Sequence, residues 1–92
     1  MIEIQNTVQS IRVCQFSREN DIFKKEVKKS YDLYLNGQWG SVASDQMDIN
    51  DEALSSNRIE QPIIGVYNTS LGNLYIVTQV NGQTKVLMEE EF

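Results

Sequence analysis

The chain has 92 residues, a formal net charge of −5 at pH 7, no histidine and one cysteine. This length favours one hydrophobic core, so we predict a single domain over residues 1–92. No apolar run approaches the roughly 20 residues that cross a bilayer, and residues 1–5 lack the pattern of a secretion signal. Because Cys14 has no second cysteine to pair with, we expect a cytoplasmic protein without membrane attachment.

The N-terminal third predicts one strand and one helix. Apolar and polar residues alternate roughly, which indicates a strand near 8–16, although Ile4, Val8 and Ile11 also fit helical spacing. From Ser17 the period changes, and we expect Ser17 to cap a helix that ends at Asn36 and the glycine after it. Its inward stripe would consist of Phe23, Val27, Tyr31 and Tyr34.

The following segment predicts a second helix, which ends near Ser56. Ser41 or Ser44 is placed to cap its start. The apolar residues that would form its inner face are Ala43, Met47 and Leu54. The opposite face would be acidic and solvated.

The last third predicts an antiparallel meander over 63–67, 74–80 and 83–88. Asn81-Gly82 favours a two-residue type I′ turn between the last two strands. That turn would pair Val77 with Val86 and Tyr75 with Met88 on the face that packs against the helices. An exposed edge of the meander could pair with a second copy, so a monomer and a homodimer are both open.

These elements together predict an α+β fold, in which two helices pack on a small antiparallel sheet. The sheet consists of the C-terminal three-stranded meander, with a fourth N-terminal strand as an open possibility. We see no linker or repeat that would divide the chain.

The sequence lacks the residue patterns of common catalytic sites, such as a Gly-rich phosphate loop or a G-x-S-x-G turn. We therefore predict no enzymatic activity, no catalytic or metal-binding residue and no cofactor. The concentrated charges lie in the acidic helix, where Asp45, Asp48 and Glu52 share one face. The residues that we expect to bind a protein partner are Trp39, Asp45, Asp48, Asp51, Glu52 and Arg58.

Two alternatives remain open at this point. Four lysines of the first helix form adjacent positive ridges that could contact phosphate, namely Lys24, Lys25, Lys28 and Lys29. The overall negative charge and the absence of interleaved aromatic residues disfavour this nucleic-acid reading. Less favoured still is a metal-dependent hydrolase that uses the carboxylates of Asp45, Asp48 and Glu52.

The C-terminal two-thirds resemble a known family. The segments that carry the resemblance are 37–40 (GQWG), 48–54 (DINDEAL), 65–69 (GVYNT), 74–78 (LYIVT) and 84–92 (TKVLMEEEF), together with Arg58. They are similar to small uncharacterised proteins carried by plasmids, prophages and integrative elements. The chain departs from that pattern at Gln79, where an acidic residue is usual, and at Met88, where proline often stands. The resemblance implies a mobile-element setting and no particular activity.

We therefore predict a non-enzymatic protein-interaction module of a mobile genetic element. An acidic helix could modulate or inhibit a host protein that processes nucleic acids or acts in defence, because clustered carboxylates can occupy a site built for phosphates. The identity of such a partner is not written in the sequence.

Overall fold

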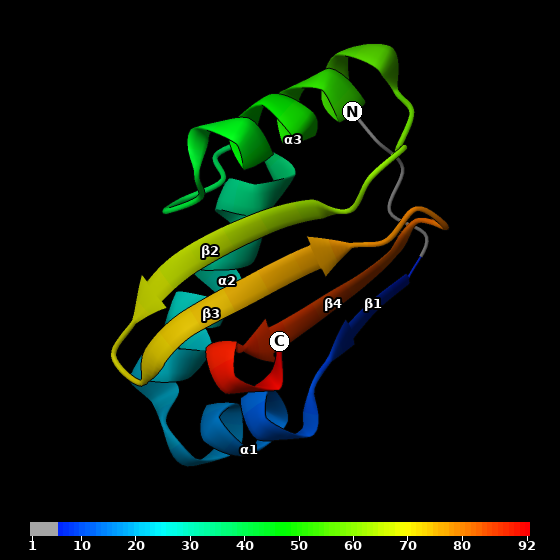
Figure 1. Cartoon of the computed structure of the whole chain (residues 1–92). Helices are drawn as coiled ribbons and strands as arrows, with labels where there is room; N and C mark the ends of the chain where they lie inside the picture. Colours follow the sequence, from blue (N-terminus) through cyan, green and yellow to red (C-terminus); the bar gives the residue numbers. More distant parts are fainter. Residues whose placement is uncertain (1–5) are drawn as a thin grey trace.

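A mixed four-stranded sheet lies at the centre of the computed structural model, which describes residues 6–92 (Figure 1). Its strands follow the order β1-β4-β3-β2, with bounds β1 (Asn6–Gln9), β2 (Ile63–Thr69), β3 (Gly72–Thr78) and β4 (Gln83–Met88). The last three form the predicted antiparallel meander, and β1 adds to β4 in parallel. The α+β class with an N-terminal fourth strand is confirmed, and the parallel pair makes the sheet mixed.

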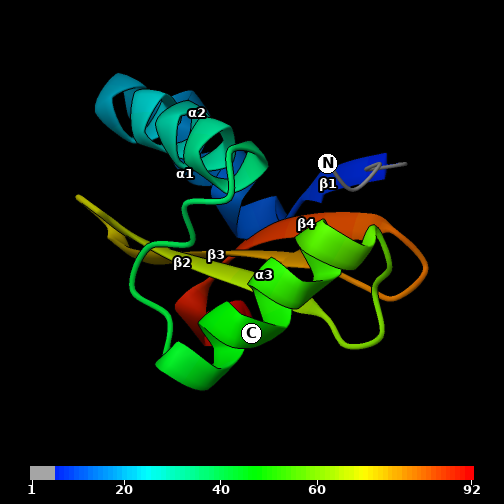
Figure 2. The same ribbon diagram turned by 90° about the horizontal axis from the view of Figure 1, so that it is seen from above.

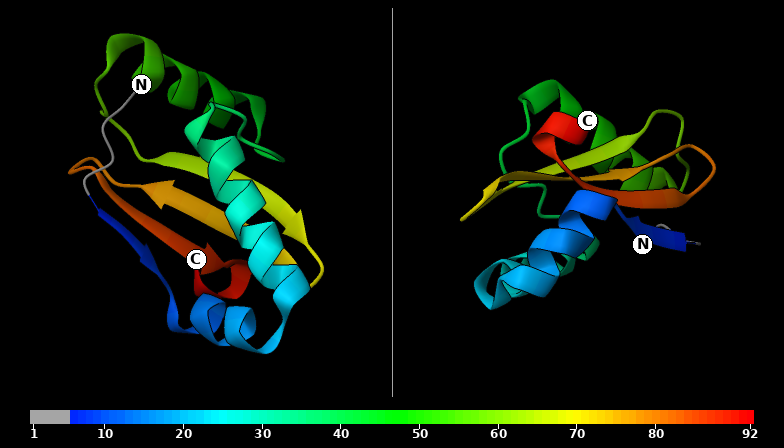
Figure 3. Two further views of the ribbon diagram at one scale, coloured as in Figure 1. Left: turned by 180° about the vertical axis from the view of Figure 1, so that it is seen from behind. Right: turned by 90° about the horizontal axis from the view of Figure 1, so that it is seen from below.

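Helices cover both faces of this sheet. They are α1 (Ile11–Glu19), α2 (Asp21–Leu35), α3 (Ser44–Ser56) and the short 3-10 turn η1 (Glu89–Glu91). Figure 2 and the right panel of Figure 3 show α1 and α2 on one side of the sheet, and α3 and η1 on the other. Three α-helices thus replace the two that were predicted. Within residues 6–92, none of them combines the length and apolarity that would let it cross a membrane.

The segment predicted as a strand over 8–16 is a strand only as far as Gln9. Ser10 ends it, because its side-chain oxygen accepts a hydrogen bond from the Val13 N–H (3.2 Å) and caps α1. Val13 is fully buried while Ile11 is 78% exposed, so the rough alternation there belongs to a helix. Part of the helical spacing noted in the sequence falls on Ile4, which lies outside the described residues.

Helix α2, which corresponds to the first predicted helix, begins later than Ser17. Asn20 accepts a hydrogen bond from the Phe23 N–H (3.0 Å), which makes Asn20 the cap of α2 and separates α2 from α1. The predicted inward stripe is confirmed for Phe23, Val27 and Tyr34, which are buried, whereas Tyr31 is only partly buried. These side chains pack against the sheet in a core that also contains Ile63, Tyr67, Leu74, Ile76, Val86 and Met88.

The turn between β3 and β4 has three residues, not two. Gln79 donates its N–H to the carbonyl of Gln83, and Gly82 donates to the carbonyl of Gln79, both at 2.8 Å. Gly82 has φ +89°, as expected when a left-handed glycine follows a tight turn and forms a bulge. The predicted register is therefore wrong by one residue.

This shift changes the partner of every residue in the hairpin. Ile76 pairs with Val86, and Tyr75 pairs with Leu87. Since side chains alternate between faces, Tyr75 lies on the side away from α2, opposite to the prediction. Val86 and Met88 do lie in the core, as predicted, but with Ile76 and Leu74 as their partners.

Candidate functional site

Helix α3 is attached to the outer edge of β2 by Asn50. This side chain is fully buried, its amide nitrogen donates to the Ile64 carbonyl (2.9 Å), and its amide oxygen accepts from the Ile64 N–H (3.2 Å). One asparagine thus satisfies both outward backbone groups of an edge residue, as a neighbouring strand would. Gln46 donates to the same amide oxygen (2.8 Å) and to the Pro62 carbonyl (3.2 Å), which fixes the orientation of Asn50.

The segment before α3 covers the next part of the same edge. Val66 donates to the Trp39 carbonyl (2.9 Å), and Ser41 donates to the Val66 carbonyl (2.8 Å). Gly40 lies between these two bonds with φ +74°, and a Cβ atom there would stand 1.9 Å from the Val66 carbonyl oxygen. Only glycine allows this close approach, so the sequence Trp39-Gly40 closes the edge.

Both edges of the meander are therefore covered, because β4 is paired with β1 on the other side. A second copy cannot pair with β2 at Ile64 or Val66 without displacing the groups that already bind there. The choice between a monomer and a homodimer through another edge stays a prediction.

Trp39 is a core residue and not an exposed corner. Only 5% of it is exposed, and its ring packs edge-on against Tyr34 with centroids 5.4 Å apart. Its indole N–H donates to an Asp51 carboxylate oxygen (2.9 Å). Trp39 was predicted to bind a partner, and its burial corrects that prediction. The same hydrogen bond ties one carboxylate oxygen of Asp51, another predicted partner-binding residue, to the core.

The buried face of α3 differs from the predicted one. Asn50 and Ala53 are buried and Leu54 is partly buried, whereas Ala43 is exposed and Met47 is 39% exposed. Residue 43 occupies the cap position without a side-chain bond, so the predicted serine caps are also wrong. Helix α3 is rotated about its axis relative to the prediction, because the Asn50 amide binds the backbone of Ile64 at the edge of β2. The spacing of apolar residues does not reveal this polar contact.

Three carboxylates point away from this attachment, and we call Asp45, Asp48 and Glu52 the acidic face of α3. All three are exposed. No ion pair involves them among the described residues. The acidic face is therefore an uncompensated negative surface on a helix whose opposite side is fixed.

A shallow open depression of about 460 Å³ adjoins the acidic face. Asp48 and Glu52 line it from α3, and Arg58, Glu60 and Gln61 line it from the loop before β2. Arg58 pairs with Glu60 (3.5 Å), and both side chains are more than 70% exposed. Arg58 therefore forms no ion pair with the acidic face of α3 and does not cover it. Exposed pairs such as Arg58–Glu60 are weak in water, so the depression remains accessible.

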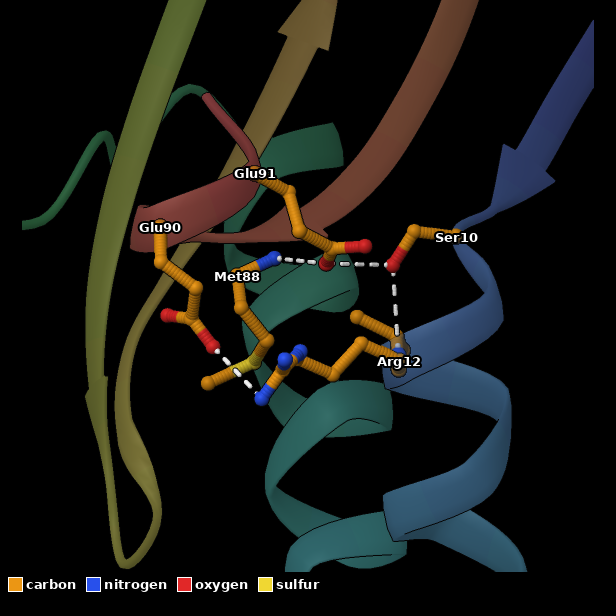
Figure 4. A network of polar contacts seen from close by, with 6 residues as sticks. Ser10, Arg12, Met88, Glu90 and Glu91 are labelled. Carbon is orange, nitrogen blue, oxygen red and sulfur yellow. Dashed lines mark hydrogen bonds and ion pairs between the residues drawn. The ribbon is translucent and has the colours of Figure 1, made fainter.

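The acidic C-terminal turn η1 provides a contrast to α3 (Figure 4). Glu91 accepts hydrogen bonds from the Ser10 hydroxyl (2.6 Å) and the Met88 N–H (2.8 Å). Glu90 forms an ion pair with Arg12 (3.2 Å). Two of the three carboxylates of η1, those of Glu90 and Glu91, thus have partners within the molecule and hold η1 against α1.

The carboxylates give the metal-hydrolase alternative no ligand set. Over residues 6–92, no group of three or more His, Cys, Asp or Glu side chains is arranged to hold a metal ion. The acidic face of α3 is spread along the helix instead of converging on one point.

The lysines of α2 are exposed, as expected for either reading of them. Lys28 lies 3.8 Å from Asp32. Glu26, which the sequence places among the lysines, turns instead to Ser70 and accepts bonds from its N–H (3.0 Å) and hydroxyl (2.6 Å). The other lysines of this cluster are therefore less neutralised than the sequence indicates.

A buried chain of hydroxyl groups joins α2 to the sheet. The Tyr34 hydroxyl lies 2.5 Å from that of Thr78, which in turn lies 2.7 Å from that of Thr84. Burial raises the pKa of Tyr34 to about 12, against the opposing effect of the Thr78 hydrogen bond. Burial also raises the pKa of Tyr67, whose hydroxyl donates to the Gln38 carbonyl (2.8 Å). These groups stay neutral at physiological pH and act in packing.

With this geometry in view, comparison with known proteins adds no relative. No protein-family model, curated protein or solved structure matches the chain.

Asn50 is the residue that the sequence interpretation missed. A signal for it exists, since Gln46, Asn50 and Ala53 form an uncharged stripe at i, i+4 and i+7 in an otherwise acidic helix. That stripe identifies the side turned toward the protein better than the few apolar residues do.

Proposed function

We propose that this protein is a non-enzymatic interaction module, and that the acidic face of α3 binds a basic surface of a protein partner. The observation that carries the proposal is the exposure of Asp45, Asp48 and Glu52 without an ion-pair partner in residues 6–92. Residues three or four apart on a helix have their Cβ atoms about 5–6 Å apart, so these three carboxylates are neighbours on the helix surface. They form a line of negative charge that a row of lysines or arginines can match.

The rigid attachment of α3 supports this function. Asn50 fixes the helix to β2, and Asp51 fixes it to Trp39. Because neither anchor uses Asp45, Asp48 or Glu52, the helix need not reorganise when the acidic face of α3 meets a partner. Preorganisation of this kind lowers the entropic cost of binding.

The depression beside the acidic face suits one cationic side chain of the partner. Asp48, Glu52 and Glu60 supply three carboxylates around it, against the single guanidinium of Arg58. An arginine of the partner could displace Arg58 from Glu60 and could itself contact two or more of these carboxylates. We therefore expect an arginine of the partner at the centre of the interface.

The class of partner follows from charge. A protein that binds nucleic acids presents the basic surface that such a helix complements. The resemblance of residues 37–92 to proteins of mobile elements favours a host protein of this kind, in nucleic-acid processing or defence, as the target.

The proposal is tested by affinity capture from host lysate with the full chain and two variants of equal charge. The first variant, Asp45→Asn/Asp48→Asn/Glu52→Gln, removes the acidic face of α3. The control, Glu19→Gln/Asp32→Asn/Glu89→Gln, removes three exposed carboxylates elsewhere. Mass spectrometry identifies retained proteins, and titration with the purified partner gives the affinity.

We expect a stoichiometric partner that binds the native chain and the control, and that binds the α3 variant at least tenfold more weakly. The loss should shrink as salt is raised, since ions screen exposed charges. A partner that binds the α3 variant as well as the native chain would refute the proposal, as would an equal loss in the control.

A further inference from the structure

An open groove of about 590 Å³ lies on the other side of the sheet, between β1 and α2. Its floor includes Val27, Val86 and the ring of Tyr31, whose hydroxyl lies 2.9 Å from that of Thr7. The left panel of Figure 3 shows α2 crossing over β2 and β3, which leaves β1 beside it without a helix on top. We call this depression the β1 groove.

Three lysines line the β1 groove from α2, namely Lys24, Lys25 and Lys28. Among the described residues of the lining, Asp21 is the one acidic side chain. The groove therefore combines an apolar floor with a net positive rim, in a protein whose formal net charge is −5. An occupant that carries both apolar and acidic groups matches this surface.

The outer edge of β1 adjoins the groove, and no strand from residues 6–92 pairs with it. Ser10 donates its N–H to the Val86 carbonyl (2.8 Å), so Ser10 faces β4. Since backbone groups alternate along a strand, the N–H groups of Thr7 and Gln9 point outward. The side chains of Thr7 and Gln9 line the groove. Every second side chain of a strand added to this edge would therefore lie next to the groove.

We infer that the β1 edge and the β1 groove together form a second interaction surface, which takes an extended segment of a partner protein with alternating acidic and apolar residues. The backbone of the segment pairs with Thr7 and Gln9. Its apolar side chains lie over Val27 and Val86, and its carboxylates meet the lysines. Addition of a strand to an open edge, with pockets for alternate side chains, is an established mode of peptide recognition.

Nucleic acid fits this surface less well. Single strands bind through exposed aromatic platforms on which bases stack. Tyr31 is partly buried, and its hydroxyl is held by Thr7. The open backbone edge would also have no role in binding a nucleic acid.

The test uses the full chain, labelled with ¹⁵N, and a short capped peptide of alternating glutamate and valine. We expect peptide binding to shift the NMR signals of Thr7, Gln9 and α2, and to slow hydrogen exchange of the Thr7 and Gln9 amides. The variant Lys24→Gln/Lys25→Gln/Lys28→Gln should bind roughly tenfold more weakly, the sum of three exposed charge pairs. The variant Arg12→Gln/Lys29→Gln/Lys85→Gln changes net charge equally at residues outside the groove lining and should bind normally.

A second peptide, N-methylated at alternate residues, separates strand addition from simple charge attraction because it cannot complete the pairing. Equal binding of this peptide would overturn the inference. So would equal weakening by the two charge variants, no binding at millimolar peptide, or a single-stranded oligonucleotide that binds the same lysines more tightly than the peptide. None of these outcomes depends on α3, so failure of this inference and failure of the proposed function can be distinguished.

Discussion

At the β2 edge of the sheet, the outward backbone groups of Ile64 and Val66 bind Asn50 and residues 39–41. At the β1 edge, by contrast, no strand of the described part of the chain lies beside Thr7 and Gln9. An uncovered edge strand invites pairing with another chain. The protein closes one edge with a helix and leaves open the other, which is only four residues long. The closed edge carries the acidic face of α3, and the open edge adjoins the lysines.

The largest effect should follow from opening the β2 edge at Gly40. In Gly40→Ala the added Cβ would overlap the Val66 carbonyl, so residues 39–41 must move away and lose both hydrogen bonds to Val66. Two lost bonds and left-handed strain amount to about 4 kcal/mol of unfolding free energy. Urea denaturation of the variant measures this loss.

Gly37→Ala is the matched control for this substitution. Gly37 also has a left-handed backbone (φ +76°), but its Cβ would meet side chains and no backbone atom, namely the end of Leu54 at 3.2 Å and the ring of Trp39 at 3.9 Å. We expect a loss of about 1 kcal/mol, from strain alone. Similar losses in the two variants would mean that the contact with Val66 does not close the edge.

The next effect should come from Asn50→Ala. This variant leaves the N–H and carbonyl of Ile64 without their partners beneath α3, at a cost of about 3 kcal/mol. Hydrogen exchange at the Ile64 amide should accelerate. Met47→Ala, at a position that the sequence favoured for the inner face, should cost less than about 1 kcal/mol because Met47 is 39% exposed. A larger loss in Met47→Ala than in Asn50→Ala would support the predicted orientation of α3, with Met47 turned inward.

The sequence predicts well those features that depend on local periodicity. The inward stripe of α2 and the three meander strands follow from the spacing of apolar residues, and both are present. Turn and cap details were harder, because several residues could serve each role. Asn20 competes with Ser17 for the cap of α2, and a bulge at Gly82 competes with a two-residue turn at Asn81-Gly82.

The attachment of α3 could not be predicted in the same way. The exposed carboxylates of the candidate site were expected from the sequence, whereas the roles of Trp39 and Asn50 depend on β2, which follows them in the chain. The β1 groove likewise joins β1, α2 and β4. Such surfaces become visible only when the topology brings distant segments together.

An alkaline titration tests a buried contact next to the β2 edge, where the Tyr34 hydroxyl donates to the Ile63 carbonyl (3.3 Å). Burial raises the pKa of Tyr34 from 10.0 to about 12, so between these values the unfolded chain loses the phenolic proton while the folded chain keeps it. Stability is therefore full below about pH 10 and falls by roughly 2 to 3 kcal/mol as the pH approaches 12.

Urea midpoints for the native chain and Tyr34→Phe, at about pH 9 and about pH 11, measure this contribution. At the lower pH the variant should lose about 1 kcal/mol through its missing hydrogen bonds. At the higher pH its further loss should be smaller than that of the native chain, with a remainder from Tyr67, whose pKa is also raised. Equal alkaline losses would show that Tyr34 does not keep its proton in the folded state.

The smallest effect should be found at the open edge, with Thr7→Val. The substitution removes the exposed hydrogen bond to Tyr31 and preserves the branched shape that suits a strand, so we expect a loss below about 1 kcal/mol. Because the outward amides of Thr7 and Gln9 have no strand to protect them, they should exchange rapidly in both the native chain and the variant, in contrast to Ile64. Slow exchange at Thr7 and Gln9 in the native chain would mean that this edge is covered in solution, and it would remove the basis for strand addition there.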